Sequence, residues 1–128
     1  MSDEWAKLES FAFGDSPEMA DCLLGFVLAG SKRATCWSVA DGQQTYPGKQ
    51  MVVRDGAGRP RAVVETFELE QCRFCDVDLQ FALDEGEGDE TLDDWRRGHQ
   101  AYFERNGGFD PEMMLWCERF KLIDVIEE

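Results

Sequence analysis

A lysine and a threonine three residues apart mark the first segment with potential for chemistry. They lie in the stretch LAGSKRATCWSV, residues 28–39, where an apolar run ends at Gly30 and an alternating segment begins. Threonine is a weak nucleophile unless a base lies beside it, and a lysine can be that base when partial burial lowers its pKa. Lys32 and Thr35 are therefore a candidate catalytic pair, with the backbone N–H groups after Gly30 as a candidate oxyanion site. The alternative is structural: Lys32 neutralises the C-terminal end of a helix, and Thr35 is an ordinary strand residue.

A run of carboxylates is the second candidate group. Residues 84–94 contain seven acids and no base. Glu85 and Glu87 suit either a catalytic acid or a Mg²⁺ site. The spacing lacks the full EF-hand pattern, so calcium binding through that motif is not expected. The alternative is a solvated acidic surface.

Aromatic residues and one histidine complete the candidates for ligand contact. Trp37, Tyr46 and Trp95 are possible stacking surfaces for a base, and Trp37 is favoured because it shares a strand face with Thr35. The only histidine, His99, lies on one helical face with Trp95 and would serve as a general acid–base if that face lines a pocket. The alternative for each of these residues is ordinary core packing.

Charge is distributed unevenly along the chain. The net charge of −14 opposes broad binding to a polyanion, which depends on counterion release by lysine and arginine. Residues 30–64 nevertheless hold six basic residues against two acids. This segment is either a local anion-binding groove or a chance cluster on a soluble surface. Its candidate contacts to phosphate or substrate are Arg33, Lys49, Arg54, Arg59 and Arg61.

The five cysteines do not indicate a disulfide framework, because their number is odd and they are widely spread. Cys72 and Cys75 form a CxxC pair, but a structural zinc ion needs four ligands. The remaining cysteines and His99 have no paired spacing with which to complete such a set. We therefore expect reduced, mostly buried thiols and no metal site.

Periodicity predicts an α+β protein with one domain over residues 1–128. A helix is expected over 16–29, with Ser16 as N-cap and Gly30 as its stop. A second helix is expected after Asp89 or Thr91, ending at Gly107 and Gly108. The remaining expectations are a short helix within 3–14, a strand over 34–39, a loop over 42–50, two strands within 50–72 around the turn at 55–58, a helical turn within 73–86, and one or two strands within 113–126.

The chain contains no apolar run long enough to span a membrane. Its first residues, MSDEWAKLES, are polar and acidic, which is not typical of a secretory signal. We therefore expect a cytoplasmic protein without a membrane partner. The sequence does not indicate an oligomeric state.

Four stretches in order resemble the ASCH domain family over nearly the whole chain. They are GSKRAT, PGKQMVVRDGAGRPRAVVET, FALDEGEGDETLDDWRRGHQAYF and MLWCERFKL. The resemblance is to small bacterial members, and it implies a PUA-like fold, a small mixed β-barrel flanked by two or three helices. ASCH domains are proposed to bind RNA, some small bacterial members hydrolyse the acyl amide of N4-acetylcytidine, and others are reported to cut RNA.

In the amidohydrolase members the active residues are the lysine and threonine of the G-x-K-x-x-T turn and a downstream glutamate. Matched by motif, these positions are Lys32, Thr35 and Glu85. The stretch before the glutamate is longer here, ALDEGE, so Glu87 is the alternative carboxylate. The residues expected to contact substrate are Arg33, Trp37, Tyr46, Arg54, Glu87, Trp95 and His99.

Two classes of function follow from this resemblance. The first is a hydrolase without a cofactor that acts on an acylated cytidine amide, and the acidic body favours such a small or uncharged ligand. The second is an RNA-binding module or a ribonuclease assisted by Mg²⁺, which the basic segment over 30–64 favours. A closed pocket lined by Lys32, Arg33, Arg54 and Glu85 would favour the enzyme, and a long open groove would favour RNA binding.

Overall fold

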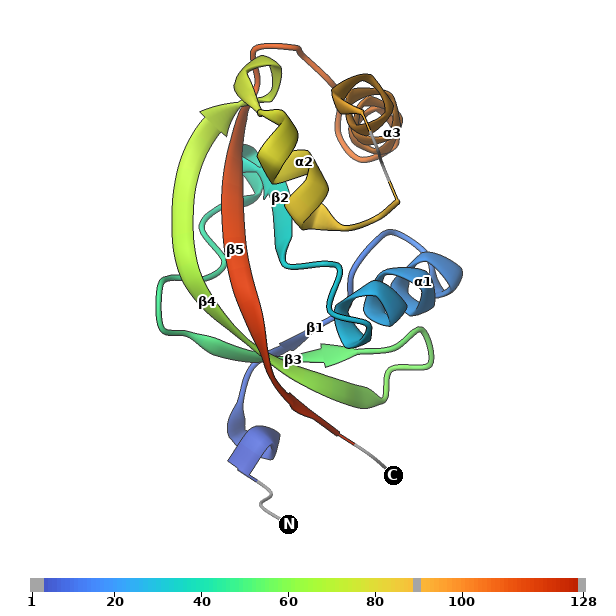
Figure 1. Cartoon of the computed structure of the whole chain (residues 1–128), viewed down its shortest axis with the longest axis vertical. Helices are drawn as coiled ribbons and strands as arrows, with labels where there is room; N and C mark the ends of the chain where they lie inside the picture. The colour runs from blue at the N-terminus through green and yellow to red at the C-terminus, as the bar shows by residue number, and fades with distance from the viewer. Residues whose placement is uncertain (1–3, 89–90, 127–128) are drawn as a thin grey trace.

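Two long antiparallel strands run the length of the molecule (Figure 1). They are β4 (Pro60–Arg73) and β5 (Met114–Val125). The structure is a computed structural model that describes residues 4–88 and 91–126. The pairing register shifts at two places, between Val63 and Val64 and between Thr66 and Glu68. Such irregularities increase the local twist and bend a strand. Residues 114–125 thus form one bent strand, and the expected alternative of two strands is not observed.

Three shorter strands extend this pair into a five-stranded sheet with the order β1-β3-β4-β5-β2. β3 (Gln50–Arg54) forms the expected hairpin with β4, and β2 (Ala34–Ser38) pairs antiparallel with β5. β1 (Ser10–Phe11) runs parallel to β3. The outer strands β1 and β2 are not paired with each other in the described part of the chain, so the barrel that these strands outline is open between them.

The N-terminal segment differs from the short helix expected within residues 3–14. Only a 3₁₀-helix, η1 (Glu4–Lys7), is present, and the chain then becomes extended. The backbone of Val52 donates to the carbonyl of Glu9, so pairing with the free edge of β3 replaces helical hydrogen bonds here. Trp5 and Phe11 still pack on the body, each against a different apolar cluster.

Each α-helix begins at a side-chain cap. Ser16 caps α1 (Pro17–Leu28), as expected, and Asp78 caps α2 (Leu79–Glu85). Thr91 caps α3 (Leu92–Arg105), whereas Asp89, the other expected cap, lies outside the described residues. Among the helices of residues 4–88 and 91–126, none has the length and apolar character needed to cross a bilayer. The short 3₁₀-helices are η2 (Val39–Asp41) and η3 (Phe74–Asp76).

The three α-helices lie on one side of the β4–β5 pair, with α2 and α3 near one end and α1 near the other (Figure 1). One apolar cluster, which includes Trp95 and Phe103 of α3, packs beneath α2 and α3. Another, which includes Leu24 and Val27 of α1, packs against β3, β4 and β5. The α+β class is therefore confirmed.

Gly86 lets the loop after α2 approach the turn after α1, and we predict that Gly86→Ala destabilises the fold. A Cβ at Gly86 would lie 1.9 Å from the Ser31 carbonyl oxygen, and its φ of +63° is costly for other residues. Gly30→Ala is the matched control, because φ is +86° but nothing lies within 4 Å of the added Cβ. Urea denaturation should show a loss of about 1 kcal/mol for Gly30→Ala and about 2 to 4 kcal/mol for Gly86→Ala. Equal losses would contradict the close approach.

Candidate functional site

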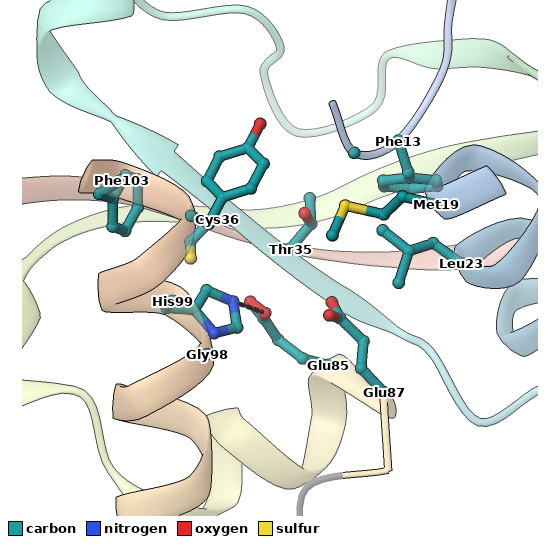
Figure 2. Close-up of a pocket in the computed structure, with 12 residues that line it drawn as sticks. Phe13, Met19, Leu23, Thr35, Cys36, Glu85, Glu87, Gly98, His99 and Phe103 are labelled. Carbon is teal, nitrogen blue, oxygen red and sulfur yellow. Dashed lines mark hydrogen bonds and ion pairs between the residues drawn. The ribbon is translucent and has the colours of Figure 1, made fainter. Parts of the chain in front are cut away.

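A cavity of about 240 Å³ lies where α1, α3, β2 and the loop after α2 meet (Figure 2). Apolar side chains of the α1 region form one wall, and α3 forms the opposite wall. Polar groups come from β2 and from the end of α2. The lining residues are Phe13, Gly14, Met19, Leu23, Thr35, Cys36, Glu85, Glu87, Gly98, His99, Tyr102 and Phe103.

Lys32 is buried beside this cavity, with 1 % of its surface exposed. Its Nζ donates to the carbonyl of Ala34 at 2.8 Å and to the carbonyl of Glu85 at 3.4 Å, and it forms an ion pair with Glu87 Oε2 at 2.6 Å. It also lies 5.2 Å from the ring centre of Phe13. All three N–H donors of an ammonium group are thereby used. Lys32 contacts the loop after α2 rather than serving only the end of α1.

The turn that carries Lys32 is held by its own backbone. The N–H groups of Ser31 and Lys32 both donate to the carbonyl of Phe26, and that of Arg33 donates to the carbonyl of Asp84. The expectation that the N–H groups just after Gly30 form an oxyanion site is therefore wrong for residues 31–33, because these donors are already engaged. Their role is to fix the direction of the lysine side chain.

Thr35 is a half-buried residue of β2 whose side chain lies on the cavity wall. No hydrogen bond joins its hydroxyl to Lys32 in the described part of the chain, because the lysine donors have other acceptors. Figure 2 shows the side chains of Glu85 and Glu87 pointing toward β2, where Thr35 lies. The cavity therefore brings the Thr35 hydroxyl together with the carboxylates of Glu85 and Glu87. Glu87 is also the ion-pair partner of Lys32.

The two candidate glutamates have different partners. Glu87 binds Lys32, whereas Glu85 is buried and its Oε2 lies 2.9 Å from Nε2 of His99. The ring of His99 stacks on Trp95, with centres 4.1 Å apart and planes inclined by 18°. Its Nδ1 lies 3.0 Å from the carbonyl oxygen of Trp95. The structure thus places both glutamates at the cavity, but the side-chain partner of Lys32 is Glu87.

Burial and charge act in opposite directions on the Glu85–His99 pair. Burial alone would raise the pKa of Glu85, but the attraction of His99 and Lys32 outweighs it, and the pKa lies below its ordinary value. Burial alone would lower the pKa of His99, but the charge of Glu85 and its hydrogen bond to His99 outweigh this effect and raise that pKa. In this pair the attraction between the two groups therefore outweighs the cost of burying them.

A second cavity, of about 330 Å³, adjoins the first and shares Phe13, Gly14, Thr35, Cys36 and Tyr102 with it. Trp37 and the buried carboxyl of Glu118 also line this second cavity. Thr66 donates to Glu118 at 2.6 Å, and the Thr45 hydroxyl lies 2.8 Å from that of Thr66. Trp37, whose Nε1 donates to the carbonyl of Gly42, is therefore within reach of a ligand that spans both cavities.

Several expected contact residues lie away from the first cavity. Arg33 is exposed and pairs with Asp84, and Tyr46 is 56 % exposed, with Lys49 above its ring. Arg54 belongs to β3, and Trp95 is fully buried beneath His99, so it presents no free ring face to a ligand. Lys32, Arg33 and Arg54 do not line one pocket together. Of the residues expected to contact substrate, Glu87 and His99 line the first cavity and Trp37 lines the second.

The sequence reasoning missed Cys36, Tyr102 and Glu118 as site residues. Cys36 follows Thr35 directly, and the alternation of a strand places neighbouring side chains on opposite faces. Both nevertheless line the cavity, because β2 is an outer strand of the sheet and lies between the two cavities. The helical spacing of His99 and Tyr102 was a usable signal for a shared face, whereas nothing in the sequence distinguished Glu118.

Comparison with known proteins identifies the class. The ASCH domain family profile matches residues 9–124, and the chain therefore belongs to this family, which is linked to RNA binding. Its fold is the PUA-like fold of ASCH domains. No functionally curated protein is similar enough to be matched.

The solved structures that are similar to this chain include the following three. Protein EF3133 from Enterococcus faecalis V583 is 31 % identical, with a TM-score of 0.83, over 91 % of this chain and 77 % of that protein. The ASCH domain from Lactobacillus crispatus JV V101 is 27 % identical, also with a TM-score of 0.83, over 95 % of this chain and 86 % of that domain. The hypothetical protein PH0355, 11 % identical with a TM-score of 0.59, covers 77 % of this chain and 89 % of its own, and supports the fold alone.

We predict that Lys32→Ala lowers the free energy of unfolding by about 3 kcal/mol, because it leaves Glu87 and two carbonyls without their buried donor. Arg33→Ala is the control, since that side chain is 64 % exposed and the loss should be less than about 0.5 kcal/mol. Urea denaturation of both variants measures the difference. A small loss for Lys32→Ala would show that the amine is not held as described.

We predict a pH-dependent effect of Glu118→Gln on stability. Burial raises the pKa of Glu118, although the hydrogen bond from Thr66 and the charge of Lys32 partly offset it. A carboxyl group whose pKa is higher in the folded than in the unfolded state stabilises the fold at pH values below its unfolded-state pKa. This stabilisation is lost as the pH rises through the folded-state pKa. The stability of the variant relative to the original chain should therefore increase from acidic to neutral pH in urea titrations. A difference that is constant over this range would contradict the shift.

Proposed function

We propose that this protein hydrolyses the acyl amide of an N4-acylated cytidine nucleoside in the first cavity. The observation that carries the proposal is the convergence of the Lys32–Glu87 ion pair, the Thr35 hydroxyl and the Glu85 carboxylate at one cavity. The resemblance to small bacterial amidohydrolases assigns activity to Lys32, Thr35 and Glu85. The geometry adds Glu87 as the partner of the lysine.

The size and charge of the site support a small substrate. A volume of about 240 Å³ holds part of a nucleoside, and the adjoining cavity adds space beside Trp37 for a base. The net charge of −14 disfavours a long polyanion. An uncharged nucleoside is small enough for these cavities and is not repelled by the negative charge of the protein.

The ion pair supplies a route for activating Thr35. In the proposed reaction Lys32 transfers one proton to Glu87, 2.6 Å away, and becomes a neutral amine. The amine turns from the Ala34 carbonyl to Thr35 and accepts its hydroxyl proton, and Oγ1 attacks the acyl carbon. The re-formed ammonium stabilises the oxyanion and then protonates the departing cytidine amine as the C–N bond breaks.

A water molecule completes the cycle. It attacks the acyl group on Thr35 and transfers its proton to Lys32, which returns this proton to Thr35 as the ester bond breaks. The proton held by Glu87 then passes back to Lys32, so that only carboxylic acid and cytidine leave the site. Glu85, held by His99 on the wall of the cavity, faces the departing amine in this scheme.

The test is deacylation of N4-acetylcytidine by the purified chain and two Thr35 variants. Thr35→Val keeps the shape of the side chain but removes the nucleophile, so turnover should fall on the order of 10³-fold or more. Thr35→Ser is the matched control, which keeps a hydroxyl and should retain measurable activity. The Thr35 hydroxyl has no hydrogen-bond partner among the described residues, so both variants should fold, and far-ultraviolet circular dichroism checks this.

Equal activity in Thr35→Val and the original chain would overturn the nucleophile assignment. A labelled RNA, with and without Mg²⁺, distinguishes the other possibilities within the family. Retention of RNA without turnover of the nucleoside would identify a binding module, and Mg²⁺-dependent cleavage would identify a ribonuclease. Either of these results, without deacylation, would overturn the proposal.

A further inference from the structure

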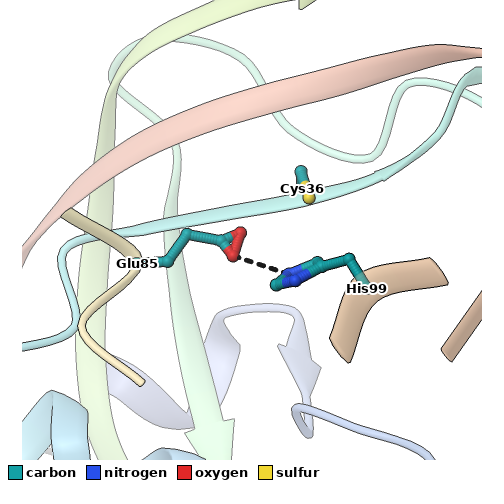
Figure 3. A group of neighbouring side chains, drawn as sticks. All are labelled: Cys36, Glu85 and His99. Atoms are coloured by element: carbon teal, nitrogen blue, oxygen red, sulfur yellow. Dashed lines mark hydrogen bonds and ion pairs between the residues drawn. The ribbon is translucent and has the colours of Figure 1, made fainter. Parts of the chain in front are cut away.

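Three side chains capable of binding a metal ion meet on the α3 side of the cavity (Figure 3). Cys36 comes from β2, Glu85 from the last turn of α2, and His99 from α3. Their ligand atoms all lie within 4.8 Å of one another. They are separated in sequence by 49 and 14 positions, and therefore only the fold brings them together.

The hydrogen bonding of His99 leaves one ring nitrogen facing the cluster. Its Nδ1 lies 3.0 Å from the Trp95 carbonyl oxygen, which can only accept, so Nδ1 carries a hydrogen. Nε2 then faces the Glu85 carboxylate at 2.9 Å, and this contact requires a second proton between the two groups. A histidine whose other nitrogen donates to a backbone carbonyl is oriented as metal-binding histidines are. A cation could take the place of the shared proton.

Glu85 supplies an independent observation. Its side chain is 1 % exposed, and its second oxygen, Oε1, has no hydrogen-bond partner in the described part of the chain. A buried carboxylate oxygen without a partner is costly, because its lost hydration is not replaced. The Cys36 thiol lies beside this carboxylate.

We propose that Cys36, Glu85 and His99 form a binding site for a zinc-like divalent metal ion. Sulfur, imidazole nitrogen and carboxylate oxygen are the ligands that Zn²⁺ takes in proteins, and a site with three protein ligands leaves a fourth position open. Here the fourth position faces the cavity that Thr35 lines. A soft thiolate ligand disfavours Mg²⁺ and Ca²⁺.

The distances need only small adjustments for such a site. Ligand atoms on one tetrahedral zinc ion lie roughly 3.3 to 3.8 Å apart, as bond lengths of about 2.0 to 2.3 Å require. The Glu85 oxygen and the His99 nitrogen, now 2.9 Å apart, would separate slightly. The Cys36 sulfur, within 4.8 Å of both, would approach by about 1 Å through side-chain rotation.

Binding can be written with its protons. The metal ion displaces the thiol proton of Cys36 and the proton shared by Glu85 and His99, and both pass to solvent. No electron is transferred, and no other reactant is needed. The site shares Glu85 with the proposed deacylation, but Lys32, Thr35 and Glu87 are not among its ligands, so metal binding does not require that reaction.

Cobalt(II) is a direct probe, because its spectrum reports the ligands. The full chain, reduced and stripped of metal, is titrated with Co²⁺ at about pH 8, where thiol ligands deprotonate more readily. We expect one Co²⁺ per chain, a thiolate-to-cobalt charge-transfer band and intense visible bands of a four-coordinate ion. Zn²⁺ should displace the cobalt, since it binds such sites more tightly.

Variants identify the ligands. Cys36→Ser should abolish the charge-transfer band, whereas Cys75→Ser, which removes an exposed thiol of the CxxC pair, should leave it unchanged. His99→Gln retains a group able to bond to Glu85 and should weaken cobalt binding at least about tenfold. Far-ultraviolet circular dichroism shows whether each variant is folded, and His99→Gln provides the test if Cys36→Ser is not.

Two results would overturn the site. One is the absence of a charge-transfer band in the original chain. The other is a band that survives in Cys36→Ser and disappears in Cys75→Ser, which would place the metal at the CxxC pair. Because the readout is a spectrum, failure of the metal site and failure of deacylation are distinguishable.

Discussion

The buried ammonium group of Lys32 is the constraint on which the site depends. A charge removed from water must find acceptors, and this one finds them in three places: the Ala34 carbonyl at the start of β2, the Glu85 carbonyl at the end of α2, and the Glu87 carboxylate in the following loop. Each contact ties a different segment to the turn after α1. The cavity lies where these segments meet.

The same electrostatic requirement organises the acidic groups inside the protein. The chain has an excess of 14 negative charges, yet the carboxylates at the cavity have basic side chains as partners, Lys32 for Glu87 and His99 for Glu85. Glu118 is different, because a hydroxyl rather than a cation bonds to it, and burial raises its pKa. Burial and pairing thus shift the pKa values of Glu85 and Glu118 in opposite directions.

The two proposals use opposite sides of one cavity. Lys32, Thr35 and Glu87 lie toward the turn after α1, whereas Cys36 and His99 lie toward α3, and Glu85 is common to both groups. A metal ion on the α3 side would replace the proton between Glu85 and His99 without removing the Lys32–Glu87 pair. Membership of the ASCH family does not decide between these uses, because a shared fold does not specify the chemistry of a site.

Much of the fold could be predicted because its signals are local. Ser16 followed by Pro17 predicted the start of α1, and the turn at 55–58 between apolar segments predicted the β3–β4 hairpin. The segment over 3–14 was mispredicted because its backbone pairs with β3, a partner far away in sequence. Local secondary-structure propensity gives no information about which strand of a sheet a segment pairs with.

For the site, the sequence by itself determined which chemical groups are available and marked Lys32 and Thr35 by their motif. Only the tertiary structure decided their partners: Lys32 pairs with Glu87, Glu85 pairs with His99, and Cys36 joins them. It also placed Trp95 beneath His99 and Arg33 in solvent. The physical reason is that ion pairing and burial depend on distances of a few ångströms between segments, which are set when β2, α2 and α3 pack together.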